Sequence, residues 1–227
     1  MSLYFKILIF SFILPFLFSF HSKINFYKKW IPFFKANLIT LIPFLIWDEI
    51  FTVKKIWGFN NEHLSGVYLS NLPLEEVLFF IIIPYCCIFT YEVIKKFSFT
   101  QNIKCKLVTL FLSALTFILG LSNTEHLYTS VTMISLGLLL FYQFIVNKEF
   151  LYPFYLMYII IHLTGFILVN GLLTGFMLDI PPVWYNYEET LNIRLGSIPI
   201  EDFFYSMLLL LCNTVLFEAF KTKKMKL

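Results

Sequence analysis

The sequence LPLEE at residues 72–76 returns as IPIED at residues 198–202, 126 residues further along the chain. Each copy places a proline before two adjacent acidic residues, and a third acid, Glu92 or Glu218, follows 17 residues after the first of them. Proline is tolerated as the first residue of a helix, where its missing N–H would have no partner anyway. We therefore expect each proline to be the first residue of a helix. The equal spacing indicates an internal duplication.

The composition around these motifs is that of a membrane protein. The 227 residues are 59% hydrophobic and 14% charged, with a mean hydropathy of +0.79, whereas a soluble domain carries about 25% charged residues. This excludes a nucleic-acid binder, a secreted disulfide scaffold and a disordered chain. The chain has no phosphate-binding loop or dinucleotide fingerprint, and its four cysteines lack metal-ligand spacing. We expect no cofactor and no metal.

Seven segments have the roughly 17–25 mostly apolar residues that a membrane-spanning helix needs. They are residues 2–20, 34–52, 73–94, 104–122, 127–146, 153–173 and 199–220. The first three align with the last three, which predicts an all-α integral membrane protein of seven transmembrane helices. Two parallel three-helix repeats, residues 1–96 and 127–227, would be joined by a linking helix within residues 97–126. A pseudo-twofold axis along the membrane normal should relate the repeats, with binding sites where they meet.

The basic residues predict the orientation of these spans. Four of the 17 fall on one side (Lys6, Lys54, Lys55 and Arg194), and the remaining 13 fall on the other. Because positive charge is enriched in cytoplasmic loops, we expect the C-terminus in the cytoplasm and the N-terminus outside. The predicted location is a bacterial inner membrane.

The acidic pairs, Glu75 with Glu76 and Glu201 with Asp202, fall in the first turns of the third and seventh spans. One acid in a first turn is explained by the helix dipole, which it complements by about 0.3–1 kcal/mol. Two adjacent acids, duplicated and followed by apolar runs, instead favour a functional site, because ionisable groups are costly at membrane depth.

Two further polar residues lie on the same predicted side. Asp48 follows Trp47 at the end of the second span, but the corresponding residue of the second half is Thr174. The two halves are therefore not equivalent here. Arg194 is the chain's single arginine, and it is interpreted either as a surface anchor or as a partner that keeps one carboxylate ionised.

Aromatic residues follow the acids within one or two turns, and their ring faces can stabilise positive charge. They are Phe79, Phe80, Phe203, Phe204 and Tyr205. Glu92 and Glu218 lie near lysine clusters at the opposite side, where we expect ordinary interfacial pairing. His162, near the middle of the sixth span, is expected to be a hydrogen-bonded core residue.

Two stretches resemble the heterodimer-type lycopene cyclases over nearly the whole chain. The first comprises Trp47-Asp48, Gly66 and residues 73–80, and the second comprises residues 194–205, Asn213 and Glu218. The halves of that family occur as two subunits or as one fused chain, and this chain resembles the fused form. The resemblance implies no obligatory partner subunit, although a homo-oligomer stays open.

The resemblance also implies a reaction. Lycopene, or another linear carotene in the bilayer, would be cyclised to β-ionone rings without a change of redox state. A protonated carboxyl group would protonate the terminal alkene of a ψ end group, and the neighbouring double bond would close the ring before a proton is lost. Burial and a second carboxylate nearby would keep the acid protonated and water away.

On this basis we hypothesise that Glu75 and Glu201 supply the acid and base, while Asp48 and Arg194 tune them. Glu76 and Asp202 would complete the catalytic set. The residues expected to contact substrate are Arg194, Trp47, Phe79, Phe80, Phe204 and Tyr205.

Three other classes stay open. A membrane carotenoid hydratase would begin with the same protonation and end with water addition. A small transporter would use the acids to carry protons or cations, although they gather at one membrane face and the central spans lack broken helices. In an assembly protein, the acids would act only as interfacial anchors.

Overall fold

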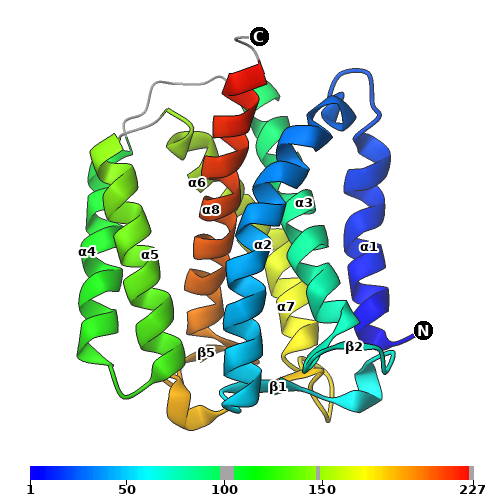
Figure 1. The fold of residues 1–227 in the computed structure, drawn as a ribbon, viewed down its shortest axis with the longest axis vertical. Helices are drawn as coiled ribbons and strands as arrows, with labels where there is room; N and C mark the ends of the chain where they lie inside the picture. The colour runs from blue at the N-terminus through cyan, green and yellow to red at the C-terminus, as the bar shows by residue number, and fades with distance from the viewer. Residues whose placement is uncertain (98–104, 147–148, 225–227) are drawn as a thin grey trace.

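The computed structural model describes residues 1–97, 105–146 and 149–224 (Figure 1). The chain forms an elongated helical bundle, with short strands at the end where the N-terminus lies and the C-terminus at the opposite end. Each of the seven predicted ranges is mostly helical over its described residues, residue 104 of the fourth lies outside them, and the sixth is divided by a π-helix. The helices are α1 (Leu3–Phe18), α2 (Trp30–Val53), α3 (Leu74–Phe97), α4 (Lys106–Ser122), α5 (Leu127–Val146), α6 (Leu151–Ile161), the π-helix (His162–Phe166), α7 (Ile167–Leu173) and α8 (Ile200–Lys224).

Length and apolar composition fit an all-α membrane protein. Five stretches of the described chain are long and apolar enough to cross a bilayer: Phe26–Val53, Leu74–Phe97, Leu127–Val146, Leu151–Leu173 and Ile200–Lys221. The remaining two, α1 with 16 residues and α4 with 17, are apolar but shorter.

Prolines inside two helices leave carbonyl groups that other helices satisfy. Pro84 deprives a carbonyl of α3 of its helical donor, and Asn37 of α2 donates to that oxygen at 2.9 Å. In α1, Pro15 frees the Ser11 carbonyl in the same way, and the Cys86 thiol of α3 donates to it at 3.4 Å. These bonds join α1 and α2 to α3.

The loops at the strand end repeat each other with the offset of 126 residues. The first half has a 3₁₀ turn (Asn61–His63) and a hairpin of β2 (Tyr68–Leu69) and β3 (Leu72–Pro73). The second half has a 3₁₀ turn (Tyr187–Glu189) and a hairpin of β5 (Arg194–Leu195) and β6 (Ile198–Pro199). The duplication seen in the motifs therefore extends to the loops before them.

The expectation that the motif prolines are the first residues of helices is wrong. Pro73 and Pro199 end β3 and β6, and the helices begin one residue later, at Leu74 and Ile200. The backbone N–H groups of these two later residues donate back across the hairpins, at 2.8 and 2.9 Å. Proline has no N–H and could not donate this bond. The motif proline therefore occupies the last position of the hairpin, one residue before the donor.

A strand pair joins the two halves at this end. β1 (Trp57–Phe59) pairs antiparallel with β4 (Val183–Tyr185), with Gly58 opposite Trp184 at the centre. The offset of 126 carries residue 57 to 183 and residue 59 to 185, so exchanging the halves reproduces the same pairing. The pair thus has the symmetry expected at a pseudo-twofold axis.

Ion pairs join the halves at the other end. Lys221 of α8 binds Glu92 of α3 at 2.6 Å, and Lys95 of α3 binds Glu218 of α8 at 2.7 Å. The offset relates these two pairs as well. Lys29 also pairs with Glu92, which is 4% exposed. The predicted pairing of both glutamates with lysines is confirmed.

The helix α4 packs along α5, at the side of the bundle away from α1 (Figure 1). The approach is close, because a Cβ added to Gly120 would lie 2.9 Å from the backbone nitrogen of Ile134. Small residues allow such close packing between membrane helices. The helix predicted to link the repeats therefore lies beside α5.

Candidate active site

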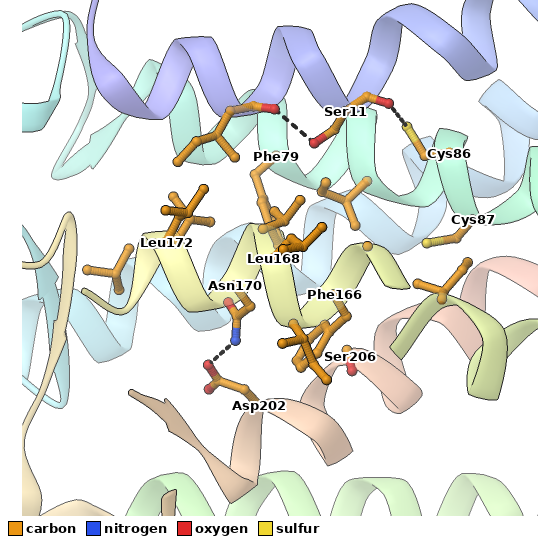
Figure 2. A pocket seen from close by; sticks show the side chains of 18 of the residues that line it. Ser11, Phe79, Cys86, Cys87, Phe166, Leu168, Asn170, Leu172, Asp202 and Ser206 are labelled. Carbon is orange, nitrogen blue, oxygen red and sulfur yellow. Dashed lines mark hydrogen bonds between the residues drawn. The ribbon is translucent and has the colours of Figure 1, made fainter. Parts of the chain in front are cut away.

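A cavity of about 1190 Å³ lies between α1, α3, the π-helix, α7 and α8 (Figure 2). Most of its wall is apolar, and Figure 2 shows Phe79, Leu168 and Leu172 around it. Its carboxylates belong to the last turns of α2 and the first turns of α3 and α8, near the strand end. They are Asp48, Glu76 and Asp202.

Asp48 is 1% exposed, and its two carboxyl oxygens have different surroundings. Its Oδ1 accepts a hydrogen bond from Trp57 Nε1 at 2.6 Å. Its Oδ2 lacks a well-formed hydrogen bond among the described residues, although Thr52 lies nearby. The indole N–H is a donor only, so Oδ1 must accept, and Oδ2 is the oxygen left to carry a proton.

Glu76 accepts one hydrogen bond, from the Tyr4 hydroxyl at 2.5 Å. It is close enough for its charge to act on both Asp48 and Asp202. The three acids therefore form one electrostatic group, although they come from three helices and both halves of the chain.

Asp202 is the most fully bonded of the three acids. It accepts hydrogen bonds from Tyr128 at 2.6 Å, from Asn170 at 2.6 Å and from Tyr185 at 3.0 Å. Three donors satisfy an ionised carboxylate, which can only accept. Burial raises the pKa of Tyr185 well above its usual value, and the nearby charge of Asp202 raises it further. Tyr185 is therefore a neutral donor at neutral pH.

Glu75 and Glu201 do not line the cavity. In each, Oε1 accepts a backbone N–H of the preceding loop, from Ser65 at 2.6 Å or Leu191 at 2.7 Å. The same oxygens accept hydroxyl groups from the first helix of each half or the residue before it, at 2.7 Å in both cases. Oε2 of both residues is buried and has no partner among the described residues. These contacts hold the loops against the helix starts.

The residues expected to contact substrate divide into two groups. Phe79, Phe80 and Tyr205 line the cavity. The others lie outside its wall: Trp47, Phe204 and Arg194.

Arg194 donates to the Ser197 carbonyl at 2.7 Å, and its guanidinium lies over the rings of Tyr185 and Tyr187. None of the described carboxylates forms an ion pair with it. The structure thus brings Asp48 together with one acid from each motif, while Arg194 stays with the loop aromatics.

Some positions related by the offset of 126 carry side chains of different size and differ in whether they line the cavity. Asn170 lines the cavity, whereas its counterpart Phe44 is 5% exposed and packs on Phe80 and Tyr205. Ser206 also lines the cavity, and its counterpart is Phe80. Asn170 of the second half thus leaves space at a position that Phe44 fills in the first.

The expected hydrogen bonding of His162 is confirmed. Its ring nitrogens contact Ser206 Oγ at 2.9 Å and the Tyr158 carbonyl at 2.8 Å. It begins the π-helix and lies between the rings of Tyr158 and Phe166. It also lines the cavity.

Sequence reasoning missed the donors that hold the acids, namely Tyr4, Trp57, Tyr128, Asn170 and Tyr185. One signal was present: a tyrosine occurs at the start of the first helix of each half. A second signal was Asn170, a side-chain amide within an apolar span. Trp57 and Tyr185 lie in the short strands β1 and β4, whose pairing the motifs do not predict.

Comparisons with known proteins identify the family of this chain. The family model described as lycopene cyclase matches residues 1–94 and 125–220. A curated protein of Leptosphaeria maculans, a bifunctional lycopene cyclase/phytoene synthase, is 30% identical over 86 residues, which cover 37% of this chain and 14% of that protein. No solved structure matches the chain. Because the family model covers most of its length, this chain belongs to the lycopene cyclase family.

Proposed function

We propose that this protein cyclises the ψ end group of lycopene, or of another linear carotene, to a β ring without a cofactor and without a change of redox state. The observation that carries the proposal is Asp48, a buried carboxyl group on an apolar, aromatic cavity with one oxygen lacking a well-formed hydrogen bond. Family membership supports the cyclisation chemistry.

Asp48 is assigned as the acid. The Trp57 N–H binds Oδ1 and leaves the proton on Oδ2. That proton is transferred to the terminal alkene, which becomes a tertiary carbocation. The neighbouring double bond attacks the cation and closes the ring. General acid catalysis of this kind contributes about 10²–10⁴-fold to a rate.

The cation forms beside aromatic rings and a carboxylate. Phe79, Phe80 and Tyr205 line the cavity, and their ring faces stabilise positive charge. Asp202, held ionised by its three donors, adds a fixed negative charge. The apolar wall excludes water, which would otherwise trap the cation as an alcohol.

Glu76 is assigned as the base. It has one hydrogen-bond donor where Asp202 has three, so it is the more available of the two. It takes a proton from the ring, which gives the cyclic alkene, and its proximity to Asp48 allows return of the proton to the acid. One proton enters the substrate and one leaves, so the reaction is an isomerisation.

For Glu75 and Glu201 we propose a positioning role instead of the acid and base roles hypothesised from the sequence. Their bonds to Ser65 and Leu191 hold the loops that precede Glu76 and Asp202. Each motif would then use its first acid to fix the loop and its second to face the substrate.

We further propose that the seven helices cross the bilayer as two parallel repeats with α4 as the link. The strand end would face outward and the C-terminus the cytoplasm, because 13 of the 17 basic residues belong to the latter side. Both halves are present in one chain, so the site needs no partner subunit. A bacterial inner membrane is the expected location.

The test is the pigment profile of a lycopene-accumulating bacterium that expresses this chain, separated by liquid chromatography. We expect β-carotene or the monocyclic γ-carotene. Asp48→Asn should abolish conversion, because the amide keeps an acceptor for Trp57 but has no acidic proton. The matched control is Glu49→Gln, since the neighbouring Glu49 is partly exposed and bonds Ser70 and Asn71 outside the cavity.

Unchanged lycopene, with the protein shown to be in the membrane, would contradict the proposal. Hydroxylated carotenes would instead indicate the hydratase, because water would then have captured the cation. An ε ring would keep the cyclase and change only the position from which Glu76 removes the proton.

A further inference from the structure

The cavity extends from the acids to the lipid-facing surface of the bundle. Among its lining residues, Phe10 and Leu14 of α1 are 74% and 60% exposed. On the facing wall, Leu163 of the π-helix and Leu168 of α7 are 73% and 68% exposed. Residues that line a cavity and are also largely exposed mark its rim.

This rim lies between α1 and the segment formed by the π-helix and α7. The helix α1 packs along α3, and few of its residues contact α7. In Figure 2, Phe79, Leu168 and Leu172 lie around the cavity between the ribbons of α1 and α7. The rim therefore opens toward lipid tails at mid-helix, whereas the acids lie near the helix ends at the strand side.

The π-helix shapes one edge of the opening. A π-helical turn inserts an extra residue into a helix and frequently marks a functional site. Here it contains Gly165, which lines the cavity, and a Cβ built on Gly165 would meet no heavy atom within 4 Å. The side of the opening next to Gly165 is therefore unobstructed.

We propose that this opening is a lateral portal, through which one end of a linear, apolar polyene enters the cavity directly from the bilayer. The inference rests on the proposed function, which it deepens by stating how the substrate reaches the acids. The end group passes between α1 and α7 to Asp48 and Glu76, while the rest of the chain stays in the portal and the lipid. Each binding event therefore presents a single end group.

A bulky side chain at Gly165 tests the portal. Gly165→Trp has room for its Cβ and would fill the opening. The matched control is Ile39→Trp, 126 residues earlier on α2, where the side chain is 49% exposed and does not line the cavity. In proteoliposomes containing lycopene we expect kcat/KM to fall about tenfold or more for Gly165→Trp and to change less than about twofold for the control. Equal rates for the two variants and the unchanged chain would overturn the portal.

A labelling experiment tests whether lycopene occupies the portal and does not depend on turnover. Gly165→Cys is made in a chain whose four cysteines (Cys86, Cys87, Cys105 and Cys212) are replaced by alanine. Membranes are treated with a lipid-soluble maleimide, with and without lycopene. We expect lycopene to slow labelling at residue 165 about threefold or more, and to leave Ile39→Cys unaffected.

The two outcomes separate the portal from the chemistry. Equal labelling of Gly165→Cys with and without lycopene would overturn the portal, even if the unchanged chain makes cyclic carotenes. Protection by lycopene, in a chain that makes no cyclic product, would support the portal and contradict the cyclase assignment.

Discussion

Glu76 and Asp202 lie 126 residues apart in the sequence and line one cavity, each accepting a hydrogen bond from a tyrosine in the first helix of its own half. The tyrosines are Tyr4 and Tyr128, at 2.5 and 2.6 Å. Asp48 has no such counterpart, because Thr174 occupies its position in the second half. The site is thus a symmetric pair of acids with one further acid that breaks the symmetry.

Adjacent acids of one motif should respond differently to the same substitution. Glu76→Gln is expected to lower the rate of cyclisation about 100-fold, because an amide cannot accept the ring proton. Glu75→Gln should lower it less than about tenfold, since the amide oxygen can still accept the Ser65 N–H. Initial rates in proteoliposomes measure both. The reverse order would return the catalytic role to Glu75.

Removing one donor from Asp202 should weaken catalysis without changing the alkaline side of its pH–rate profile. Tyr185→Phe leaves the bonds from Tyr128 and Asn170 and is expected to cost about 1.4 kcal/mol, a tenfold loss of rate. The raised pKa of Tyr185 keeps its hydroxyl protonated through neutral and mildly alkaline pH. The variant and the unchanged chain should therefore share the same alkaline side of the pH–rate profile, up to about pH 9. An alkaline limb that is present for the unchanged chain and absent for the variant would show that Tyr185 ionises during turnover.

The ion pairs at the C-terminal end should stabilise the fold and not the reaction. Glu92→Gln removes the negative charge that pairs with Lys29 and Lys221, and we expect a loss on the order of 1–2 kcal/mol. For a chain of this size that lowers the melting temperature by about 2–4 °C per kcal/mol. Melting in detergent, with exposed Glu125→Gln as the control, measures the loss. A fall in kcat of the folded protein would contradict a purely structural role.

Close packing of α4 on α5 predicts that enlarging Gly120 lowers stability without changing activity. Gly120→Val places carbon atoms against Ile134 and should destabilise the protein by about 1–3 kcal/mol through overpacking. Ile118→Val, at a 61% exposed position of α4, is the control. Cyclisation per folded molecule should stay unchanged in both, because α4 contributes no residue to the cavity. Altered products from Gly120→Val would show that α4 influences the site.

The helices and the duplication were predictable because their signals are local. Apolar length indicates each span, and the repeated Pro-acid-acid pattern indicates where the two halves correspond. The placement of Asp48 at the same end as the acidic pairs follows from counting residues along the spans. These inferences need no knowledge of how the helices pack.

The assignment of individual acids was not predictable, because it depends on packing. Adjacent residues of a helix point about 100° apart, so the sequence alone does not say whether Glu75 or Glu76 faces the cavity. The donors Trp57 and Tyr185 belong to strands that pair only in the folded chain. The cavity itself depends on side-chain size at distant equivalent positions.

The equivalent positions of Phe44 and Asn170 have a consequence for how a protein with two similar halves evolves. In a dimer of identical chains every substitution appears twice, so a phenylalanine that closes one cavity closes the other as well. A gene that encodes both halves removes this coupling, because codon 44 and codon 170 mutate independently. Phe44 then specialises its half for packing, while Asn170 keeps the other half open for substrate. Duplication of the half, whether the copies are fused or separate, is in this sense the step that permits division of labour between two copies of one ancestral unit.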